Sequence, residues 1–424
     1  MSVSARRLQR AQYITTPSAD RGPVSFTSIA AAQAFLSTPP DANYVLWNPI
    51  WPVDRDLEDV FATELDANDI LVLPERPEPY IIDSSEGFRA SGVQSVTGRN
   101  GQIPIVNRYH DVRNARTWFA MARARRGILG LGPNAVIKLS QSSWTQEPQI
   151  EDKDSVQSDG WVSPGRYWTN TSGVVQYELV GCQEKIIEAA HASPYFGNFS
   201  LRAHDLGGVA FSGIACTGSS QQYERLDISN GWRGFMGVPN GEAAALSTNG
   251  GTYQISRCIL GTRDDIGVRV GSSPIMINSS TGGTIEETDA CESRAGMLTI
   301  WNSSGTHVLT NVACKFNWDS PGINFEKCQS GFTLDWNGGA IWSDYNGGGG
   351  KTPKPSDQAD RGGLHIGLFS EVGSAKITLR GVDLDIGPTP GALNIQSYGA
   401  SQQNSADIEC YATDNSSIPI QLYA

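Results

Sequence analysis

The chain has 424 residues with a formal net charge of −12 at pH 7, 39% hydrophobic residues and 46 glycines. This composition suffices for a large folded body with many turns, and no apolar run approaches the roughly 20 residues that a transmembrane helix needs. The acidic balance argues against nucleic acid as the main partner, because phosphate binding calls for a basic surface.

Residues 1–55 begin with a polar stretch, continue into a predicted helix at 28–38 that ends at two prolines, and then reach the apolar segment NYVLWNPIWPVD at 43–54. This part is too short for a domain and too apolar for a free linker. We therefore expect an arm that docks on the chain's own body or on a neighbouring protein. Residues 1–26 lack the apolar core of a secretory signal, which predicts cytoplasmic synthesis without export and fits a protein released by cell lysis.

Residues 56–140 are predicted to start the folded body. Two strand candidates within 66–93 flank a Pro-rich turn, and a third is AVIKLS at 135–140. Between them, NARTWFAMARARRG at 114–127 is predicted to be an amphipathic helix, with its arginines on the wet face: Arg123, Arg125 and Arg126. Such a helix would cap the open edge of a stack of strands.

Two segments further along repeat one template, MINSSTGGTIEETDAC at 276–291 and IWNSSGTHVLTNVAC at 300–314. Asn278 and Asn302 are 24 residues apart, and Cys291 and Cys314 are 23 apart. A period of this size is typical of stacked repeats, and β-prone runs broken by Asn, Ser and Gly fit the turns of a parallel β-helix. Chance similarity between two Ser/Gly-rich turns is the alternative.

The rest of the chain has the same texture, with short β-prone runs near turn signals at 198–218, 252–260, 331–342, 375–387 and 404–412. We therefore predict an all-β solenoid, with a parallel β-helix body over 141–424 and roughly nine turns from about residue 196 onward. Polar or Gly/Pro-rich composition predicts loop excursions near 141–175 and 345–363, with coiling resumed at about 174.

The seven cysteines contain no CxxC pair, and the five histidines contain no HExxH motif. We expect neither a metal site nor a cofactor. Cys258, Cys291 and Cys314 recur next to small or apolar residues, which predicts inward stacking as free thiols.

The segments LVLPERPEPYIIDSSEGFRASGV at 71–93 and NARTWFAMARARRGILGLGPNAVIKLS at 114–140 resemble the amino-terminal part of pectin-lyase-like β-helix minor tail proteins from tailed phages of actinobacteria. The resemblance covers roughly residues 66–140. It implies a right-handed parallel β-helix, located in the virion as part of the tail, presented to the host surface and homotrimeric as in tailspikes.

That superfamily includes lyases, hydrolases and non-catalytic binders, so the fold leaves the chemistry open. A glycoside hydrolase needs two carboxyl groups roughly 5–5.5 or about 6.5–9.5 Å apart, and acids on adjacent turns could meet this demand. The catalytic candidates are Asp264, Asp265 and Glu287. Other acids nearby are Glu286, Asp289, Asp319 and Asp335. Solvated acids at turns are the alternative interpretation.

A lyase also needs a cation, and Arg263 and Arg269 lie close in sequence to the paired aspartates. The motifs that mark polygalacturonases, Asn-Thr-Asp, Gly-His-Gly and Arg-Ile-Lys, are absent. No catalytic residue therefore carries over from the family.

Glycan binding has a separate basis, since sugar rings stack on exposed aromatic faces. Candidates that could line one side of consecutive turns, together with Arg263 and Arg269, are Trp301, Trp318, Trp336 and Trp342; Tyr223 and Trp232 form an earlier pair. Core or interface packing is the alternative for each residue.

Two functions thus remain. The first is a structural tail protein that binds host surface polysaccharide and docks on other virion proteins through residues 1–55. The second is a depolymerase that uses the acids around 263–289. A head-decorating fibre differs from the first only in where the arm docks.

Overall fold

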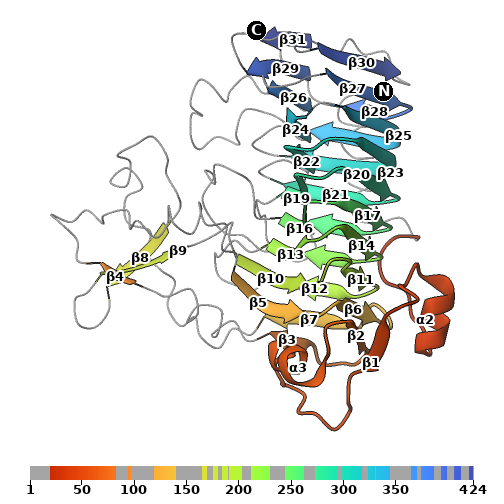
Figure 1. Cartoon of the computed structure of the whole chain (residues 1–424), viewed down its shortest axis with the longest axis vertical. Helices are drawn as coiled ribbons and strands as arrows, with labels where there is room; N and C mark the ends of the chain where they lie inside the picture. Colours follow the sequence, from red (N-terminus) through yellow and green to blue (C-terminus); the bar gives the residue numbers. More distant parts are fainter. Residues whose placement is uncertain are drawn as a thin grey trace, which may run out of the picture.

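The computed structural model shows two long parallel β-sheets stacked into one elongated body (Figure 1). It describes residues 20–82, 94–96, 119–139, 165–169, 175–179, 184–189, 191–202, 212–229, 244–261, 273–293, 298–317, 323–329, 331–343, 364–369, 374–385, 393–398, 405–411 and 420–423. Each turn of the coil, here called a rung, contributes one strand to the first sheet and continues into the second. The predicted parallel β-helix is confirmed.

The first sheet has ten strands, one per rung. In stacking order they are β5 (Phe119–Ala124), β10 (Glu184–Ala189), β13 (Ser212–Thr217), β16 (Ala244–Asn249), β19 (Ser273–Asn278), β22 (Leu298–Trp301), β24 (Ile323–Cys328), β26 (Leu364–Phe369), β29 (Leu393–Tyr398) and β31 (Ile420–Tyr423).

The second sheet has 18 strands in two rows that merge in its two longest strands. The first row is β1 (Asn43–Leu46), β2 (Asp69–Leu73), β6 (Gly127–Gly130), β11 (Tyr195–Gly197), β14 (Ser220–Glu224), β17 (Thr252–Ser256), β20 (Gly282–Glu286), β23 (Thr306–Asn317), β25 (Phe332–Ser343), β27 (Ser374–Arg380) and β30 (Ser405–Tyr411). The second row is β3 (Tyr80–Ile82), β7 (Val136–Leu139), β12 (Ser200–Arg202), β15 (Asp227–Ser229), β18 (Ile259–Gly261), β21 (Asp289–Ser293) and β28 (Asp383–Asp385), with β23 and β25 passing through both rows.

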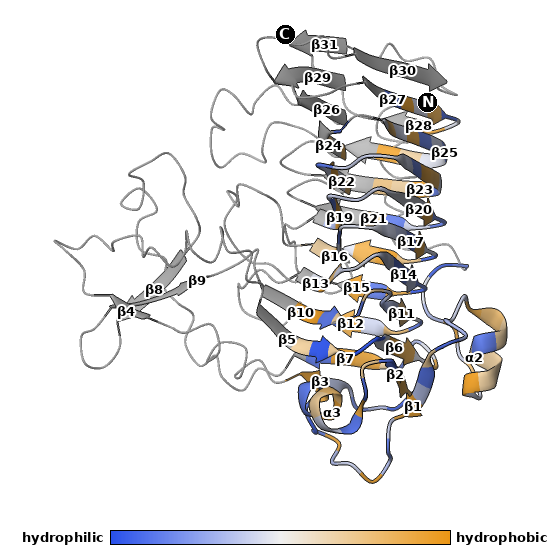
Figure 2. Cartoon of the chain, in the orientation of Figure 1, coloured by the Kyte–Doolittle hydropathy of each residue, from blue (hydrophilic) through white to orange (hydrophobic). Residues whose placement is uncertain are grey.

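Inward side chains from successive rungs stack in columns, which explains why no rung is stable alone. The central column comes from the first row of the second sheet, and register pairs each member with the next. Its members are all buried: Leu71, Ile128, Phe196, Tyr223, Ile255, Ile285, Leu309, Trp336 and Leu379. Figure 2 shows hydrophobic residues along strands of this row.

The predicted thiol positions are partly confirmed. Cys258 and Cys314 are buried and form no disulfide, and the side chain of Cys291 lies outside the description. The two buried cysteines belong to different columns. Cys314 pairs in register with Ala290. Cys258 lies beside Thr288, two residues before Ala290 in the same rung, and its amide donates to Thr288 Oγ1. Burial raises the pKa of the Cys258 thiol to about 12, so it stays protonated.

Two helices pack near the end of the stack at which the chain enters. Helix α2 (Ile29–Phe35) confirms the helix expected at 28–38, and Ser28 caps it by accepting the Ala31 amide. It lies on the outer face of the second sheet, where Ala32 and Leu36 pack against the outward side chains of Ile70, Val72, Leu129, Leu131 and Tyr195.

Helix α3 (Leu57–Glu64) closes the core at this end by burying Leu57, Val60 and Phe61. The capping helix predicted at 114–127 is wrong, because Phe119–Ala124 form strand β5. Ala122 and Ala124 are buried in register with Ile187 and Ala189. Tertiary pairing therefore overrides the helix propensity of Ala, Met and Arg.

The arginines of that segment serve the cap in another way. Arg125 donates from Nε to the Phe61 carbonyl at 2.7 Å and from a terminal nitrogen to the Ala62 carbonyl at 3.1 Å. A guanidinium on the last carbonyls of a helix satisfies acceptors that the helix leaves open. Arg126 is buried and bonds Asp41 and Asn68.

A small antiparallel sheet forms between two of the chain's insertions. It contains β4 (Gln94–Val96), β8 (Gly165–Thr169) and β9 (Val175–Leu179). The predicted return to coiling at about 174 is therefore wrong by one strand, because β9 joins this sheet and the next rung begins at β10. The excursion predicted at 345–363 lies outside the described residues, between β25 and β26.

Candidate functional site

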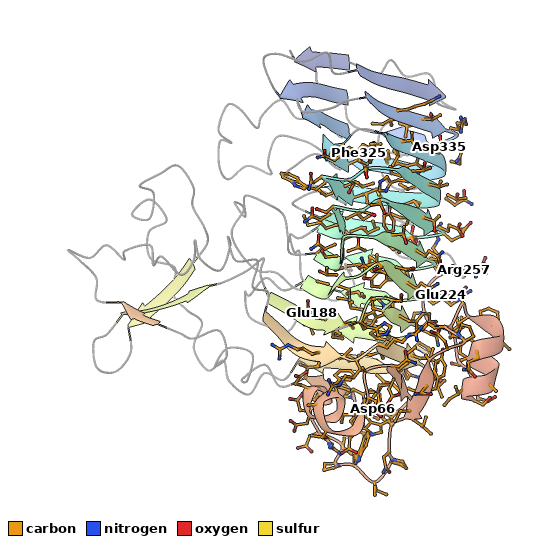
Figure 3. All side chains as sticks on the ribbon, viewed as in Figure 1. Asp66, Glu188, Glu224, Arg257, Phe325 and Asp335 are labelled. Carbon is orange, nitrogen blue, oxygen red and sulfur yellow. The ribbon has the colours of Figure 1, made fainter. Side chains whose placement is uncertain are left out.

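One edge of the stack is a line of tight turns between the two rows of the second sheet. At this turn edge a non-glycine residue adopts positive φ in five consecutive rungs: Asn198 (59°), Arg225 (52°), Arg257 (52°), Glu287 (47°) and Asn311 (51°). Backbone hydrogen bonds between rungs hold them, for example from Arg225 N to the Ser256 carbonyl and from Glu287 N to the Thr310 carbonyl, both 2.9 Å. Figure 3 shows Glu224 and Arg257 on this side of the molecule.

Residues 20–26, here called the strap, run along the turn edge and bind rung after rung. Phe26 N donates to the Leu131 carbonyl at 2.7 Å, Val24 N to Asn198 Oδ1 at 2.7 Å, and Gly22 N to the Arg257 carbonyl at 2.8 Å. The docking expected of the amino-terminal arm therefore takes place on the chain's own body for these residues. Residues 1–19 of the predicted arm lie outside the described residues.

Two side chains of the turn edge donate hydrogen bonds to backbone carbonyls in and beside the strap. Asn198 Nδ2 donates to the Val24 and Gly130 carbonyls at 2.9 Å each, and Arg225 donates to the Asp20 and Gly22 carbonyls at 3.1 Å each. Buried backbone carbonyls need such donors, so Asn198 and Arg225 fix the path of the strap over two consecutive rungs.

Arg21, near the amino-terminal end of the strap, contacts Glu287, which is a catalytic candidate from the sequence, and the neighbouring acid Asp289. Its guanidinium pairs with the buried carboxylate of Asp289, lies 3.6 Å from the half-exposed carboxylate of Glu287, and donates to the Asn311 carbonyl at 3.0 Å. Asn311 Nδ2 also donates to Glu287 at 2.7 Å. These acids thus take part in a structural ion-pair network that joins the strap to the stack.

The Arg21 network predicts a measurable loosening of the strap. Replacing Arg21 by alanine removes the ion pair to Asp289, and charge-assisted bonds of this kind contribute about 1.5 to 3 kcal/mol. We expect amide exchange at Gly22 and Val24 to accelerate about tenfold or more, measured by hydrogen–deuterium exchange. Glu287→Gln is the matched control with a smaller effect, because water screens that exposed carboxylate. Unchanged exchange in Arg21→Ala would show that the backbone bonds alone hold the strap.

The longest stretches of sequence between strands occur where the chain leaves the second sheet for the first. Between the second sheet and the next strand of the first sheet the chain has connecting stretches at 83–118, which contains β4, at 140–183, which contains β8 and β9, and at 203–211, 230–243, 262–272, 294–297, 318–322, 344–363, 386–392 and 412–419. The turns from the first sheet to the second are much shorter in the middle of the stack, as at 250–251 and 279–281. The sequence between strands is thus longest where the chain leaves the second sheet, and segments that connect the elements of a rigid scaffold commonly carry function.

Most of the predicted site residues belong to these connections. Asp264, Asp265, Arg263 and Arg269 follow β18, and Trp318 and Asp319 follow β23; all six lie outside the described residues. Glu287 occupies the turn edge instead. The pairing of Glu287 with Asp264 or Asp265 stays a prediction.

The remaining tryptophans have different environments. Trp336 is fully buried in the central column, so its indole is not available to a sugar ring. Trp301 is half-buried at the end of β22, next to buried Ile300. Trp342 ends β25 in register with Lys315 and Asp385, and its side chain lies outside the description. Tyr223 is buried in the central column as well.

Other acids of the described wall show no clustering suited to chemistry. Asp335 is half-exposed and lies 3.7 Å from Arg380 across neighbouring strands; Figure 3 shows it higher on the turn-edge side than Glu224. Among the residues that the structure describes, no group of three His, Cys, Asp or Glu side chains could hold a metal ion. None of the described helices is long and apolar enough to cross a membrane.

A solved phage protein structure is weakly similar to the chain. No protein-family model matches the chain, and no curated protein matches it. The tailspike protein gp49 from Pseudomonas phage LKA1 is similar at a TM-score of 0.27 and 9% sequence identity, over 95% of this chain and 82% of that chain. The fold assignment rests on the strand ladder itself.

Proposed function

We propose that this protein is a structural component of a phage tail, of the tailspike or minor tail type, that presents a rigid β-helix to glycans of the host cell surface. The observation that carries the proposal is a difference between two sides of the coil. One edge is occupied by the strap, whereas the longest stretches of sequence between consecutive strands follow the second row of the second sheet or the long strand β25.

The resemblance of residues 71–93 and 114–140 to actinobacterial phage tail proteins supports the assignment to a phage tail. Virion location, host attachment and a homotrimer are parts of the same proposal. The engagement of Glu287 and Asp289 by Arg21 favours binding over cleavage, because a carboxylate held in an ion pair is a poor general acid.

The test uses the purified protein and cell walls from a panel of actinobacterial strains. We expect the protein to sediment with the walls of at least one strain, without new reducing ends and without absorbance from unsaturated uronate. Trp301→Ala should weaken binding about tenfold, equivalent to about 1.4 kcal/mol, if its half-buried ring stacks on sugar. Trp336→Phe is the matched control, because Trp336 is enclosed in the core.

Cleavage products would replace the binding function by an enzymatic one. Reducing ends alone would identify a hydrolase, and reducing ends with absorbance a lyase; Asp265→Ala and Glu287→Gln would then locate the chemistry. The absence of both binding and cleavage across the panel would contradict host attachment. Sedimentation velocity of the same sample tests the trimer.

A further inference from the structure

Exposed large apolar side chains are concentrated at one place on the described surface. Of the four that are exposed, three fall within eight residues of the chain, namely Leu46 (48% exposed), Ile50 (84%) and Val53 (54%). Ile50 and Val53 belong to residues 48–55, here called the base loop, which connects β1 to α3. Figure 1 shows this loop projecting from the end of the stack that is opposite β31.

Aromatic and cationic contacts hold the base loop in a fixed shape. Trp47 is buried and packs edge-on against Trp51 (ring centroids 5.0 Å apart) and Tyr80 (4.9 Å). The Arg55 guanidinium lies 4.6 Å from the Trp51 ring. An exposed isoleucine on a braced loop loses little conformational entropy when it binds, which favours affinity.

Arg76 braces the other side of the base loop. Its guanidinium lies 3.6 Å from the Tyr80 ring and donates to the Val53 carbonyl at 3.0 Å and to the Pro79 carbonyl at 2.9 Å. Asn48 completes the turn by accepting the Ile50 amide at 3.1 Å through Oδ1. The loop therefore presents Ile50 and Val53 outward from both sides.

This end of the molecule is also strongly acidic. Residues 48–80 contain nine acidic side chains and two arginines. Two further arginines reach this end from β5, Arg123 at Glu58 and Arg125 at the last carbonyls of α3. Arg55 pairs with Glu64 at 2.7 Å, and Arg76 binds carbonyls and rings. Asp54, Asp59, Glu64 and Glu78 are exposed, and Figure 3 shows Asp66 at the same end.

We infer that the base loop is a docking plug, with Ile50 and Val53 entering an apolar socket bordered by basic side chains on another protein of the particle. The charge selects this occupant. A second copy of the chain docking through the same end would bring two acidic rims together, and an anionic membrane surface would repel the rim as well. A partner with a basic border gains from the same charges. The assembly in which the partner is sought rests on the proposed function.

The experiment measures incorporation into phage particles made from the genome that encodes the chain. The variant carries Ile50→Asp and Val53→Asp, and the matched control carries Phe35→Asp, which adds the same type of charge at a side chain as exposed (54%) as Val53. We expect the double variant to fall at least tenfold in purified particles, with Phe35→Asp near the wild-type level. Circular dichroism and protease resistance of each purified variant check that the β-helix is folded.

A photo-cross-linking residue in place of Ile50 then identifies the socket. We expect an adduct to a single particle protein with Lys or Arg beside the cross-linked position, and an association that weakens as salt rises. Normal incorporation of a folded double variant would overturn the docking inference alone. Wild-type chain absent from purified particles would overturn this inference together with the proposed function. An adduct between two copies of the chain, or flotation with anionic vesicles that the double variant abolishes, would also overturn it.

Discussion

Replacing Trp336 by alanine is expected to lower the free energy of unfolding by about 3 to 5 kcal/mol, the range for deleting a buried aromatic side chain. Trp336 is fully buried, and its register partners in the central column are Leu309 and Leu379. The column has no other side chain at this rung, so the cavity would span the gap between the two leucines. Urea unfolding followed by far-ultraviolet circular dichroism measures the loss.

Trp336→Phe separates packing from hydrogen bonding. The indole Nε1 has no hydrogen-bond partner within the described part of the chain, so phenylalanine removes an unsatisfied donor while it keeps most of the volume. We expect a much smaller loss than for alanine. Equal losses in the two variants would indicate that the indole nitrogen makes an interaction in solution that the packing does not reveal.

The tryptophan pattern shows where sequence reasoning stops. Trp301, Trp318, Trp336 and Trp342 recur at intervals below the repeat length, which suggested one exposed side. In a parallel rung a shift of one residue moves a side chain from the core to the surface. Trp336 follows the inward phase of β25, so sequence spacing without the strand register could not distinguish its position from that of Trp301.

The doubled motif predicted the repeat correctly but misaligned both of its halves, and in the first half Asn278 pairs with Trp301 and not with Asn302. The turn before β20 has three residues, 279–281, whereas the turn before β23 has four, 302–305. The register after these turns therefore runs one residue later, and Cys291 pairs with Lys315 while Ala290 pairs with Cys314. Backbone hydrogen bonds between strands fix this alignment, and it cannot be inferred by matching identical residues of the two copies.

The strap could not have been located from sequence. Arg21 contacts residues that are more than 260 positions away, and its segment has neither the period of a helix nor that of a strand. A polar arm was predictable from composition, as was its need for a docking surface. The choice of the turn edge depends on Asn198 and Arg225, whose roles follow from their positive φ and their stacking in consecutive rungs.

Acidification should destabilise the fold through His307, which is enclosed in the core. Its Nε2 lies 3.0 Å from the Ser304 carbonyl, which can only accept, so Nε2 carries the proton and Nδ1 accepts from the Tyr253 hydroxyl at 2.8 Å. The Tyr253 ring reaches across the rung between them because Gly283 has no side chain; a Cβ there would lie 2.7 Å from ring atoms of Tyr253. The Phe332 ring, at 4.9 Å between centroids, covers the other side.

Because His307 is neutral and desolvated in the folded protein, it determines the direction in which its contribution to the free energy of unfolding changes with pH. Burial lowers the pKa of His307 from 6.5 to about 4. The unfolded chain therefore binds a proton at this residue in a pH range where the folded chain does not, and stability falls as the pH decreases from 6.5 to 4. The contribution is complete above pH 6.5 and amounts to about 3 kcal/mol.

A variant without the imidazole isolates this contribution from other titrating groups. Burial raises the pKa of Glu224 and of Glu58, and carboxyl groups with raised pKa add stability as the pH falls, which opposes the histidine. The difference between wild type and His307→Gln cancels these groups, because both proteins retain them. We expect His307→Gln to be less stable at pH 7 and the gap in unfolding free energy to narrow by about 3 kcal/mol at pH 4. A gap that stays constant between pH 7 and pH 4 would mean that His307 titrates alike in the folded and unfolded chains, which its enclosure by Tyr253 and Phe332 opposes.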